Sequence, residues 1–215
     1  MKPKLADLRK SYEKGVLSQK DVMNDPIQLF QTWFNEAKEV DTIDEANAMS
    51  LSTLSTDGFP RARAVLLKDY SKEGFVFFTN YESEKGKSIF KYPKVGLSFY
   101  WPSLERQIII KGTAEKLAAN KSDDYFQSRP RGSQIGAHVS PQSNEIPDRD
   151  FLESRKLALE KKYHNKQIPR PENWGGILVK PVEIEFWQGR PNRLHDRIYC
   201  IFDQGTQWKI KRLAP

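Results

Sequence analysis

Three basic side chains recur at every second position near the carboxyl end of the chain. Arg193, His195 and Arg197 follow a turn predicted over Gly189–Pro191. If the backbone is extended there, their side chains point to one face and successive members lie roughly 6.6 Å apart. Two fixed cations and one group that titrates near neutrality predict the floor of a site for an anionic, hydrogen-bonding ligand. A solvated strand face would show the same pattern.

A second set of cations lies in the first half of the chain. Arg63 and Lys68 flank the apolar run Ala64–Leu67 of a predicted strand. Regular alternation puts the two on opposite faces, so binding one ligand together requires a bulge, a twist or contact with different parts of it. Lys85 follows a helix start at Ser83, where free backbone N–H groups favour a phosphate, although lysines on short exposed helices are common.

Polar side chains at three further places have the chemistry to hold such a ligand. Gln107 precedes three isoleucines, and its donor and acceptor match the pyrimidine edge of a flavin; a core glutamine bonded to backbone is the alternative. Tyr125, Arg129 and Ser133 recur every four residues. A guanidinium with nearby hydroxyls would hold a phosphate, and solvated side chains at a helix end are the alternative. Gln142–Ser143 adds a polar pair in a loop.

The elements that must position these side chains form an α+β pattern. Short strands with period-two alternation, joined by short turns, predict an antiparallel sheet, which we expect to close into a small barrel with helices outside. The expected strands are Ala46–Leu54, Pro60–Asp69, Phe75–Asn80, Val95–Trp101, Arg106–Lys116, Gly175–Trp187, Arg193–Phe202 and Gln207–Arg212. The expected helices begin at Asn24–Pro26 and cover Ser83–Phe90, Asn120–Ser128 and Asp148–Tyr163, with 131–147 irregular or weakly helical.

Composition limits the class of protein. The 215 residues suit one domain, here 25–215, after a polar segment 1–24 expected to be mobile. The net charge of +7 is scattered along the sequence, which favours a solvated surface or an anionic small molecule over nucleic acid. The single cysteine, Cys200, excludes an internal disulfide, and three dispersed histidines predict no metal site. Without an apolar signal core or membrane span, the expected location is cytoplasmic.

Several of these stretches, in order and across nearly the whole chain, resemble the FMN-dependent pyridoxine/pyridoxamine 5'-phosphate oxidase family. The resemblance begins at Arg9 and continues to Pro215. Its most specific pieces are Arg63–Lys68, Leu104–Gln107, Ser128–Gly136, Trp174–Gly176, Glu185–Gly189 and Arg193–Arg197.

The resemblance implies an antiparallel split β-barrel and a homodimer with FMN at the subunit interface. It implies oxidation of pyridoxine or pyridoxamine 5'-phosphate to pyridoxal 5'-phosphate by dioxygen, with release of hydrogen peroxide. The FMN contacts it implies are Arg63, Val65, Leu66, Lys68, Phe78, Thr79, Lys85, Gln107, Gln142, Ser143, Trp187 and Arg197. The substrate contacts are Lys68, Tyr125, Arg129, Ser133, Arg193 and His195, the last two also catalytic, with Arg9 and Tyr12 as a lid.

The chain departs from the family at two of these places. Glu84 stands where the family often has arginine, and an acidic residue there would weaken an FMN-phosphate contact; Phe78 replaces a frequent tyrosine. A split-barrel flavoprotein of other specificity, such as a flavin reductase, would leave Arg129, Arg193 and His195 without a shared purpose. A basic nucleic-acid-binding domain is the alternative from another class, and no recognisable motif supports it. We expect neither nucleic acid nor membrane as a partner.

Overall fold

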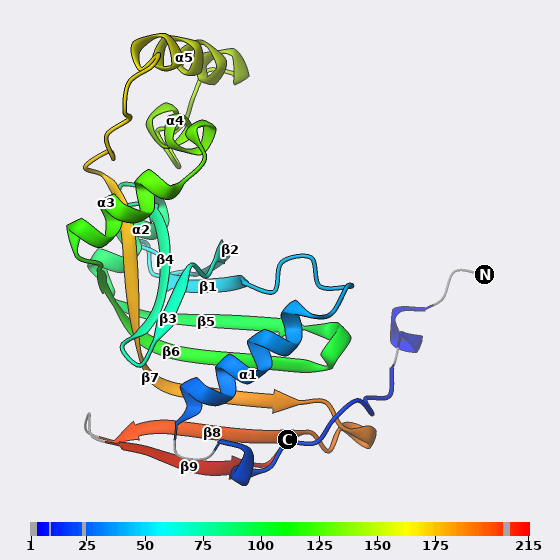
Figure 1. Cartoon of the computed structure of the whole chain (residues 1–215). Coiled ribbons are helices and arrows are strands. Elements are labelled where there is room, and N and C mark those ends of the chain that lie inside the picture. The colour runs from blue at the N-terminus through cyan, green and yellow to red at the C-terminus, as the bar shows by residue number, and fades with distance from the viewer. Residues whose placement is uncertain (1–3, 9, 23–24, 204–206) are drawn as a thin grey trace. The chain divides into compact units, whose positions relative to one another are not determined.

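The computed structural model describes residues 4–8, 10–22, 25–203 and 207–215, which form an α+β fold (Figure 1). Its helices are α1 (Pro26–Lys38), α2 (Glu84–Lys91), α3 (Ala119–Ser128), α4 (Arg131–Val139) and α5 (Arg149–Lys162), with short 3-10 helices η1 (Leu5–Asp7), η2 (Gln19–Val22), η3 (Pro102–Leu104) and η4 (Pro191–Arg193). The chain divides into two compact units. The first comprises Met1–Ser50, Gly96–Lys111 and Pro181–Pro215, and the second Leu51–Val95 and Gly112–Lys180.

Nine strands of the described residues form one sheet in the order β2-β1-β5-β6-β7-β4-β3, and β8 pairs with both β7 and β9. The strands are β1 (Ala48–Leu54), β2 (Pro60–Leu66), β3 (Asp69–Ser71), β4 (Gly74–Asn80), β5 (Lys94–Trp101), β6 (Arg106–Lys116), β7 (Trp174–Gln188), β8 (Asp196–Asp203) and β9 (Gln207–Leu213). The pairs β3–β4, β4–β7, β7–β8 and β8–β9 are antiparallel. The predicted α+β class with an antiparallel sheet is confirmed.

Helix α1 covers the sheet within the first unit (Figure 1). The Asp25 side chain caps it by accepting the N–H of Ile27 at 2.9 Å, which satisfies one of the free donors at a helix start. Phe30 and Trp33 are buried on its inner face, where their rings pack against Phe99 and Phe186 at centroid distances of 5.2 and 5.4 Å. Strands β5 and β7 are therefore held against a rigid apolar layer.

The helices of the second unit correct two expectations. The stretch 131–147 was expected to be irregular or weakly helical, but its residues 131–139 form the regular helix α4, because Ile135 and Val139 join the buried cluster of Phe126 and Trp174. Helix α3 begins at Ala119 after Ala118, and no side chain caps it, so Asn120 is not its cap.

Two strand predictions were also wrong in their bounds. Strand β8 begins at Asp196 rather than Arg193, because Asn192 and Arg193 have φ angles of 55° and 63°, which belong to a turn and not to a strand. The strand predicted over Pro60–Asp69 is broken into β2 and β3. Arg193 and His195 therefore do not form a strand row with Arg197.

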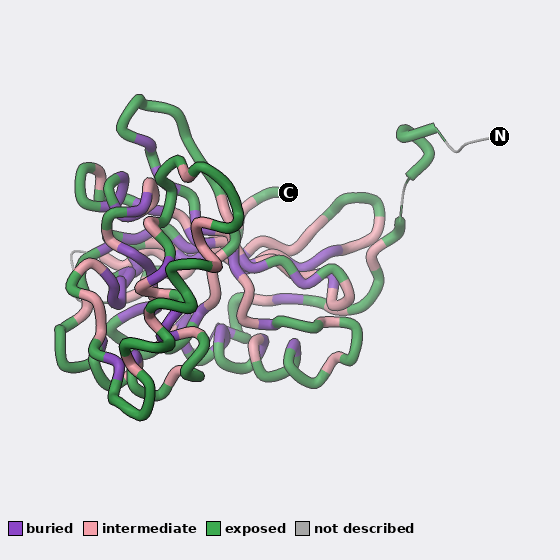
Figure 2. The backbone as a smooth tube through the Cα atoms, turned by 90° about the horizontal axis from the view of Figure 1, so that it is seen from above, coloured by how far each residue is buried: buried purple, intermediate pink, exposed green. Residues whose placement is uncertain are grey.

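Buried positions gather along the strands and the inner helix faces, whereas the stretch 4–8 is exposed throughout (Figure 2). Leu5 and Leu8 are 87% and 67% exposed there. Among the described residues, none of the helices is long and apolar enough to cross a membrane.

Candidate functional site

The second unit contains a polar pocket of about 330 Å³ with a cationic and an aromatic side. It lies where β2 and β4 end, where α2 begins and where α3 ends. The residues that line it are Ala64, Val65, Leu66, Lys68, Phe78, Thr79, Asn80, Lys85, Tyr125, Arg129, Gln142 and Trp174. Nine of the twelve were predicted as FMN or substrate contacts from widely separated stretches, and Tyr125 and Arg129 were among the predicted substrate contacts.

Arg129 lies directly after α3 with its guanidinium carbon 4.5 Å from the ring centroid of Trp174. Its Nη1 is buried, and no described residue accepts a hydrogen bond from it. Burial lowers the pKa of Arg129, and the nearby Tyr125 opposes this effect. A buried guanidinium N–H without an acceptor fits an anion, because charge-assisted bonds to two oxygens would satisfy it.

Aromatic rings form the wall behind Arg129. Phe78 stacks on Tyr125 with centroids 3.8 Å apart and planes at 17°, and on Trp174 at 5.4 Å and 15°. Stacking needs only the ring face, so phenylalanine at position 78 serves here without the hydroxyl of a tyrosine.

Lys85 lies in the first turn of α2, whose N-cap is the buried Ser83, and Arg63 lies on strand β2. The Arg63 Nη1 donates to Thr53 Oγ1 at 2.6 Å, and its Nη2 is buried with no acceptor among the described residues. Burial and then the charge of Arg63 lower the pKa of Lys85, whereas Glu84 raises it. These two cations and the free N–H groups of a helix start match a phosphate.

Glu84, where the family often has arginine, is already paired in this structure. Its carboxylate forms an ion pair with Arg61 and accepts a hydrogen bond from Ser55 Oγ at 3.2 Å. The negative charge of Glu84, which would repel a bound phosphate, is thereby balanced by the positive charge of Arg61 on strand β2.

Regular strand alternation would put Arg63 and Lys68 on opposite faces of the sheet, but strand β2 ends at Leu66, before Lys68. Lys68 follows this break, and its N–H donates to Val76 O at 2.8 Å. Because Lys68 is outside the regular alternation, it lines the pocket, while Arg63 lies on the strand beside Thr53.

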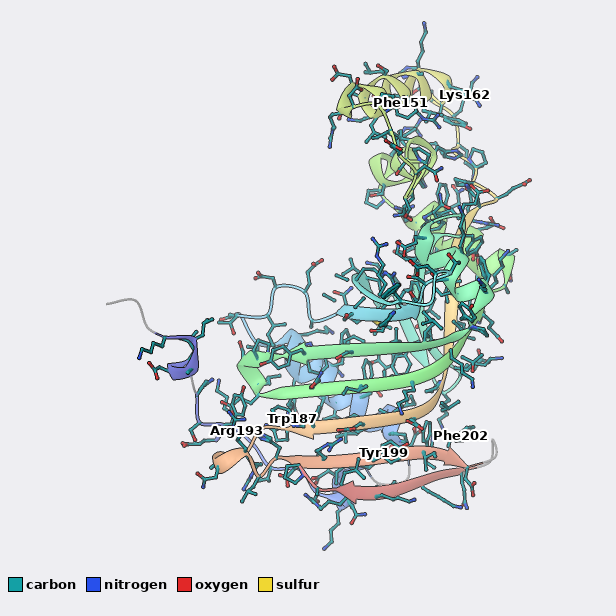
Figure 3. All side chains as sticks on the ribbon, turned by 180° about the vertical axis from the view of Figure 1, so that it is seen from behind. Phe151, Lys162, Trp187, Arg193, Tyr199 and Phe202 are labelled. Atoms are coloured by element: carbon teal, nitrogen blue, oxygen red, sulfur yellow. The ribbon has the colours of Figure 1, made fainter. Side chains whose placement is uncertain are left out.

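The first unit contains a separate cleft of about 610 Å³. It is lined by Leu8, Lys10, Ser11, Tyr12, Arg190, Asn192, Arg193 and His195. Figure 3 shows Trp187 and Arg193 close together at the end of β7 and the loop before β8. The turn at η4 thus brings Arg193 and His195 to one cleft without the predicted strand.

His195 lies against Trp187, with ring centroids 4.6 Å apart. Its Nδ1 accepts the backbone N–H of Arg190 at 3.1 Å. Burial, with the charge of Arg193 second, lowers the pKa of His195. The neutral ring therefore carries its proton on Nε2, where it is a hydrogen-bond donor.

Arg197 is held in place by Glu185 of the neighbouring strand. Its Nε and Nη2 donate to the two carboxylate oxygens at 2.7 and 3.0 Å, and this hydrogen bonding raises the pKa of Arg197. Gln107 is on β6, and its Nε2 donates to Ser98 Oγ at 3.0 Å rather than to backbone. Neither Arg197 nor Gln107 lines the cleft of Tyr12 and His195.

Six of the predicted residues line neither cavity, namely Arg63, Gln107, Ser133, Ser143, Trp187 and Arg197. Ser133 lies in the first turn of α4 and Ser143 has a φ angle of 70° in the loop after it; neither lines the pocket. Arg9 lies outside the described residues. Trp174 was quoted only as part of a motif, and its ring contact with Arg129 was missed because stacking partners distant in sequence leave no local signal. In the part of the chain that is described, no group of three or more His, Cys, Asp or Glu side chains could hold a metal ion.

Comparison with known families matches both parts of the chain. Residues 36–163 match the family model of pyridoxamine 5'-phosphate oxidase. Residues 174–215 match the model of the pyridoxine 5'-phosphate oxidase C-terminal dimerisation region.

Relatives of known name match over the full length. The pyridoxine/pyridoxamine 5'-phosphate oxidase of Christiangramia forsetii is 53% identical over 215 residues, which is 100% of both chains. That of Flavobacterium psychrophilum is 54% identical over 211 residues, 98% of this chain and 99% of the relative.

Solved structures share the fold. PhzG from Burkholderia lata, in complex with tetrahydrophenazine-1-carboxylic acid, is 28% identical with a TM-score of 0.87 and covers 96% of this chain and 100% of its own. A pyridoxamine 5'-phosphate oxidase-related, FMN-binding protein from Nostoc punctiforme has a TM-score of 0.69 at 15% identity, covering 88% and 98%. By sequence and by fold, this chain belongs to the pyridoxamine 5'-phosphate oxidase family.

Proposed function

We propose that this chain is an FMN-dependent oxidase that converts pyridoxine 5'-phosphate or pyridoxamine 5'-phosphate to pyridoxal 5'-phosphate. Dioxygen is the electron acceptor, hydrogen peroxide is released, and the amine substrate also yields ammonia. The observation that carries the proposal is identity of 53–54% to two oxidases of this name over nearly the whole of each chain. The reaction belongs to vitamin B6 biosynthesis and salvage, which supports the expected cytoplasmic location.

The residues present fit FMN. Arg63, with its unpartnered Nη2, and Lys85 at the start of α2 would hold the phosphate. The amide of Gln107 would bond the edge of the ring, and the cation of Arg197 would stabilise negative charge near it. When bound, the flavin supplies hydride acceptance at N5 and electron transfer to dioxygen. The further FMN contacts that we propose are Val65, Leu66, Lys68, Phe78, Thr79, Gln142, Ser143 and Trp187.

We place the flavin between two copies of the chain. The proposed phosphate contacts Arg63 and Lys85 belong to the second unit, whereas Gln107, Trp187 and Arg197 belong to the first. The match of 174–215 to a dimerisation region supports this arrangement, since that region contains two of these three residues. In a homodimer, one subunit would supply the phosphate contacts and its partner the ring contacts.

The substrate phosphate is the proposed ligand of Arg129, Lys68, Tyr125 and Ser133. The unpartnered, buried Nη1 of Arg129 is the strongest support, because an anion would complete its hydrogen bonding.

Arg193 and His195 orient the ring substituents of the substrate. The neutral His195, with its Nδ1 occupied by the N–H of Arg190, donates from Nε2 to a substrate oxygen and can relay a proton there. Tyr12 lies over the same cleft, and Arg9 is proposed to join it.

Turnover by purified protein tests the function. With FMN and air, each phosphorylated vitamer should yield equal amounts of pyridoxal 5'-phosphate and hydrogen peroxide. A flavin-loaded protein that is inert to both vitamers would refute the proposal. Flavin reduction by a nicotinamide coenzyme without vitamer oxidation would instead support a flavin reductase.

A further inference from the structure

A buried carboxylate has no part in the site described above. Glu105 follows η3 in the hairpin between β5 and β6, and it is only 2% exposed. Its φ angle is 57°, in the left-handed region that non-glycine residues rarely adopt. A buried, charged side chain on a strained backbone needs compensating contacts, and those contacts show what it does.

The carboxylate of Glu105 binds the backbone of the N-terminal segment. Its Oε2 accepts the N–H of Glu13 at 2.7 Å and of Lys14 at 3.0 Å, and its Oε1 lies 3.2 Å from Lys10 Nζ. Burial alone would raise the pKa of Glu105, but the N–H of Lys14 and the ammonium of Lys10 outweigh burial and lower it. Glu105 is therefore charged at neutral pH and bound to a segment about 90 residues away in sequence.

The backbone of Glu105 is fixed to the end of strand β7. Its carbonyl oxygen accepts the N–H of Gly189 at 2.8 Å and the Nε2 of Gln188 at 3.2 Å. The side chain and the carbonyl group thus tie two pieces of chain together, the segment 10–14 and the start of the loop that carries Arg193 and His195.

The side chain of Tyr12, in the segment 10–14, packs against the other piece of chain. Its ring centroid lies 5.8 Å from that of Trp187 and 5.8 Å from that of His195. A Cβ atom on Gly189 would lie 2.8 Å from the Cβ of Tyr12, closer than such atoms approach, so only glycine at 189 admits the tyrosine. Tyr12 directly precedes Glu13 and Lys14, whose N–H groups donate to the Glu105 carboxylate.

We propose that Glu105 is a positioning residue that anchors the segment 10–14 and so places Tyr12 as a wall of the substrate cleft beside His195. This inference deepens the proposed function and rests on it for its kinetic consequence. The alternative is that Glu105 only stabilises the β5–β6 hairpin in which it lies.

Hydrogen exchange separates these two roles without any need for activity. In Glu105→Ala, the amides of Glu13 and Lys14 should exchange at least about tenfold faster, because they lose a charged acceptor. Amides of β6 should keep their protection. Glu13→Ala is the matched control, since it removes an exposed side chain and keeps the N–H that Glu105 accepts. Unchanged exchange at 13 and 14 in Glu105→Ala would overturn the anchor.

Kinetics then test the placement of Tyr12. Glu105→Ala should raise the KM for pyridoxine 5'-phosphate about tenfold and leave FMN affinity unchanged, while Glu105→Gln, which keeps one acceptor oxygen, should recover part of the loss. Gly189→Ala, which displaces Tyr12 directly, should reproduce the effect.

The double variant Tyr12→Ala/Glu105→Ala decides whether Glu105 acts through Tyr12. Its KM should equal that of Tyr12→Ala alone, because the anchor then has nothing to position. Effects that multiply would show that Glu105 acts independently of Tyr12 and would overturn the inference. A wild-type protein without oxidase activity would refute the proposed function instead, and the exchange experiment would still test the anchor.

Discussion

Replacement of Arg129 by alanine should selectively weaken the binding of phosphorylated substrate. The Nη1 of Arg129 is buried without an acceptor, so a substrate phosphate would gain at least one fully desolvated, charge-assisted hydrogen bond there. Such a bond contributes about 1.5–3 kcal/mol. The KM for pyridoxine 5'-phosphate should therefore rise roughly 10- to 140-fold, with kcat changed far less.

Arg129→Lys is the matched control, because it keeps the charge but loses the planar group that stacks on Trp174 at 4.5 Å and can bind two oxygens. Its KM should lie between those of the wild type and Arg129→Ala. FMN affinity, measured by the quenching of flavin fluorescence, should be unchanged in both variants. The unphosphorylated vitamer should show the same kcat/KM in all three proteins. An unchanged KM for the phosphorylated substrate, or an equal loss with the unphosphorylated one, would refute the assignment of Arg129 to the phosphate.

Other residues of the site give three further expectations. Arg193→Ala and His195→Ala should each lower turnover while flavin stays bound; loss of flavin from both would show that they do not face substrate. Arg193→Ala should also raise the pKa of His195, since it removes a nearby cation, and should move the acid limb of the kcat/KM profile to higher pH; an unmoved limb would exclude His195 as its source. Arg61→Ala should weaken FMN binding about 2- to 5-fold, because it leaves Glu84 unpaired, and added Glu84→Gln should restore the affinity; riboflavin, which lacks the phosphate, is the control ligand.

The lowered pKa of His195 also predicts how the stability of the folded protein changes with pH. Folding disfavours the charged form of His195. While His195 is neutral in both the folded and the unfolded chain, it does not lower the free energy of unfolding. The cost develops as pH falls below its ordinary value of 6.5, where the unfolded chain gains a proton that the folded chain resists. Acid should therefore destabilise the wild type more than His195→Asn, as thermal unfolding at several pH values would show.

Local signals in the sequence predicted the elements that depend on local contacts. The predicted cap Ser83 starts α2, and α5 starts after Asp148, the first residue of its predicted range; each side chain accepts a backbone N–H from three residues ahead. Helix α4 was not predicted as regular, because its apolar face is stabilised by distant residues such as Trp174.

The turn before β8 shows where a local pattern in the sequence gave a wrong prediction. The alternation of Arg193, His195 and Arg197 predicted a strand, but the backbone at Asn192 and Arg193 is left-handed. The sequence-based hypothesis that Arg193 and His195 share a site agrees with their common cleft, although its geometric reason was wrong.

Glu105 could not have been singled out by its type and spacing. It looks like one of many surface acids between Leu104 and Arg106, and only its contacts with 10–14 identify it as buried. Pairing between segments far apart in sequence carries no local pattern, which is also why the Arg61–Glu84 pair was missed.

The most direct test of the oxidase assignment is an anaerobic titration of the FMN-loaded protein with pyridoxine 5'-phosphate, followed by flavin absorbance. We expect the flavin to bleach with one equivalent of substrate, pyridoxal 5'-phosphate to form in equal amount, and air to restore the colour. A flavin that stays oxidised with both phosphorylated vitamers, yet is reduced by a nicotinamide coenzyme, would contradict the assignment.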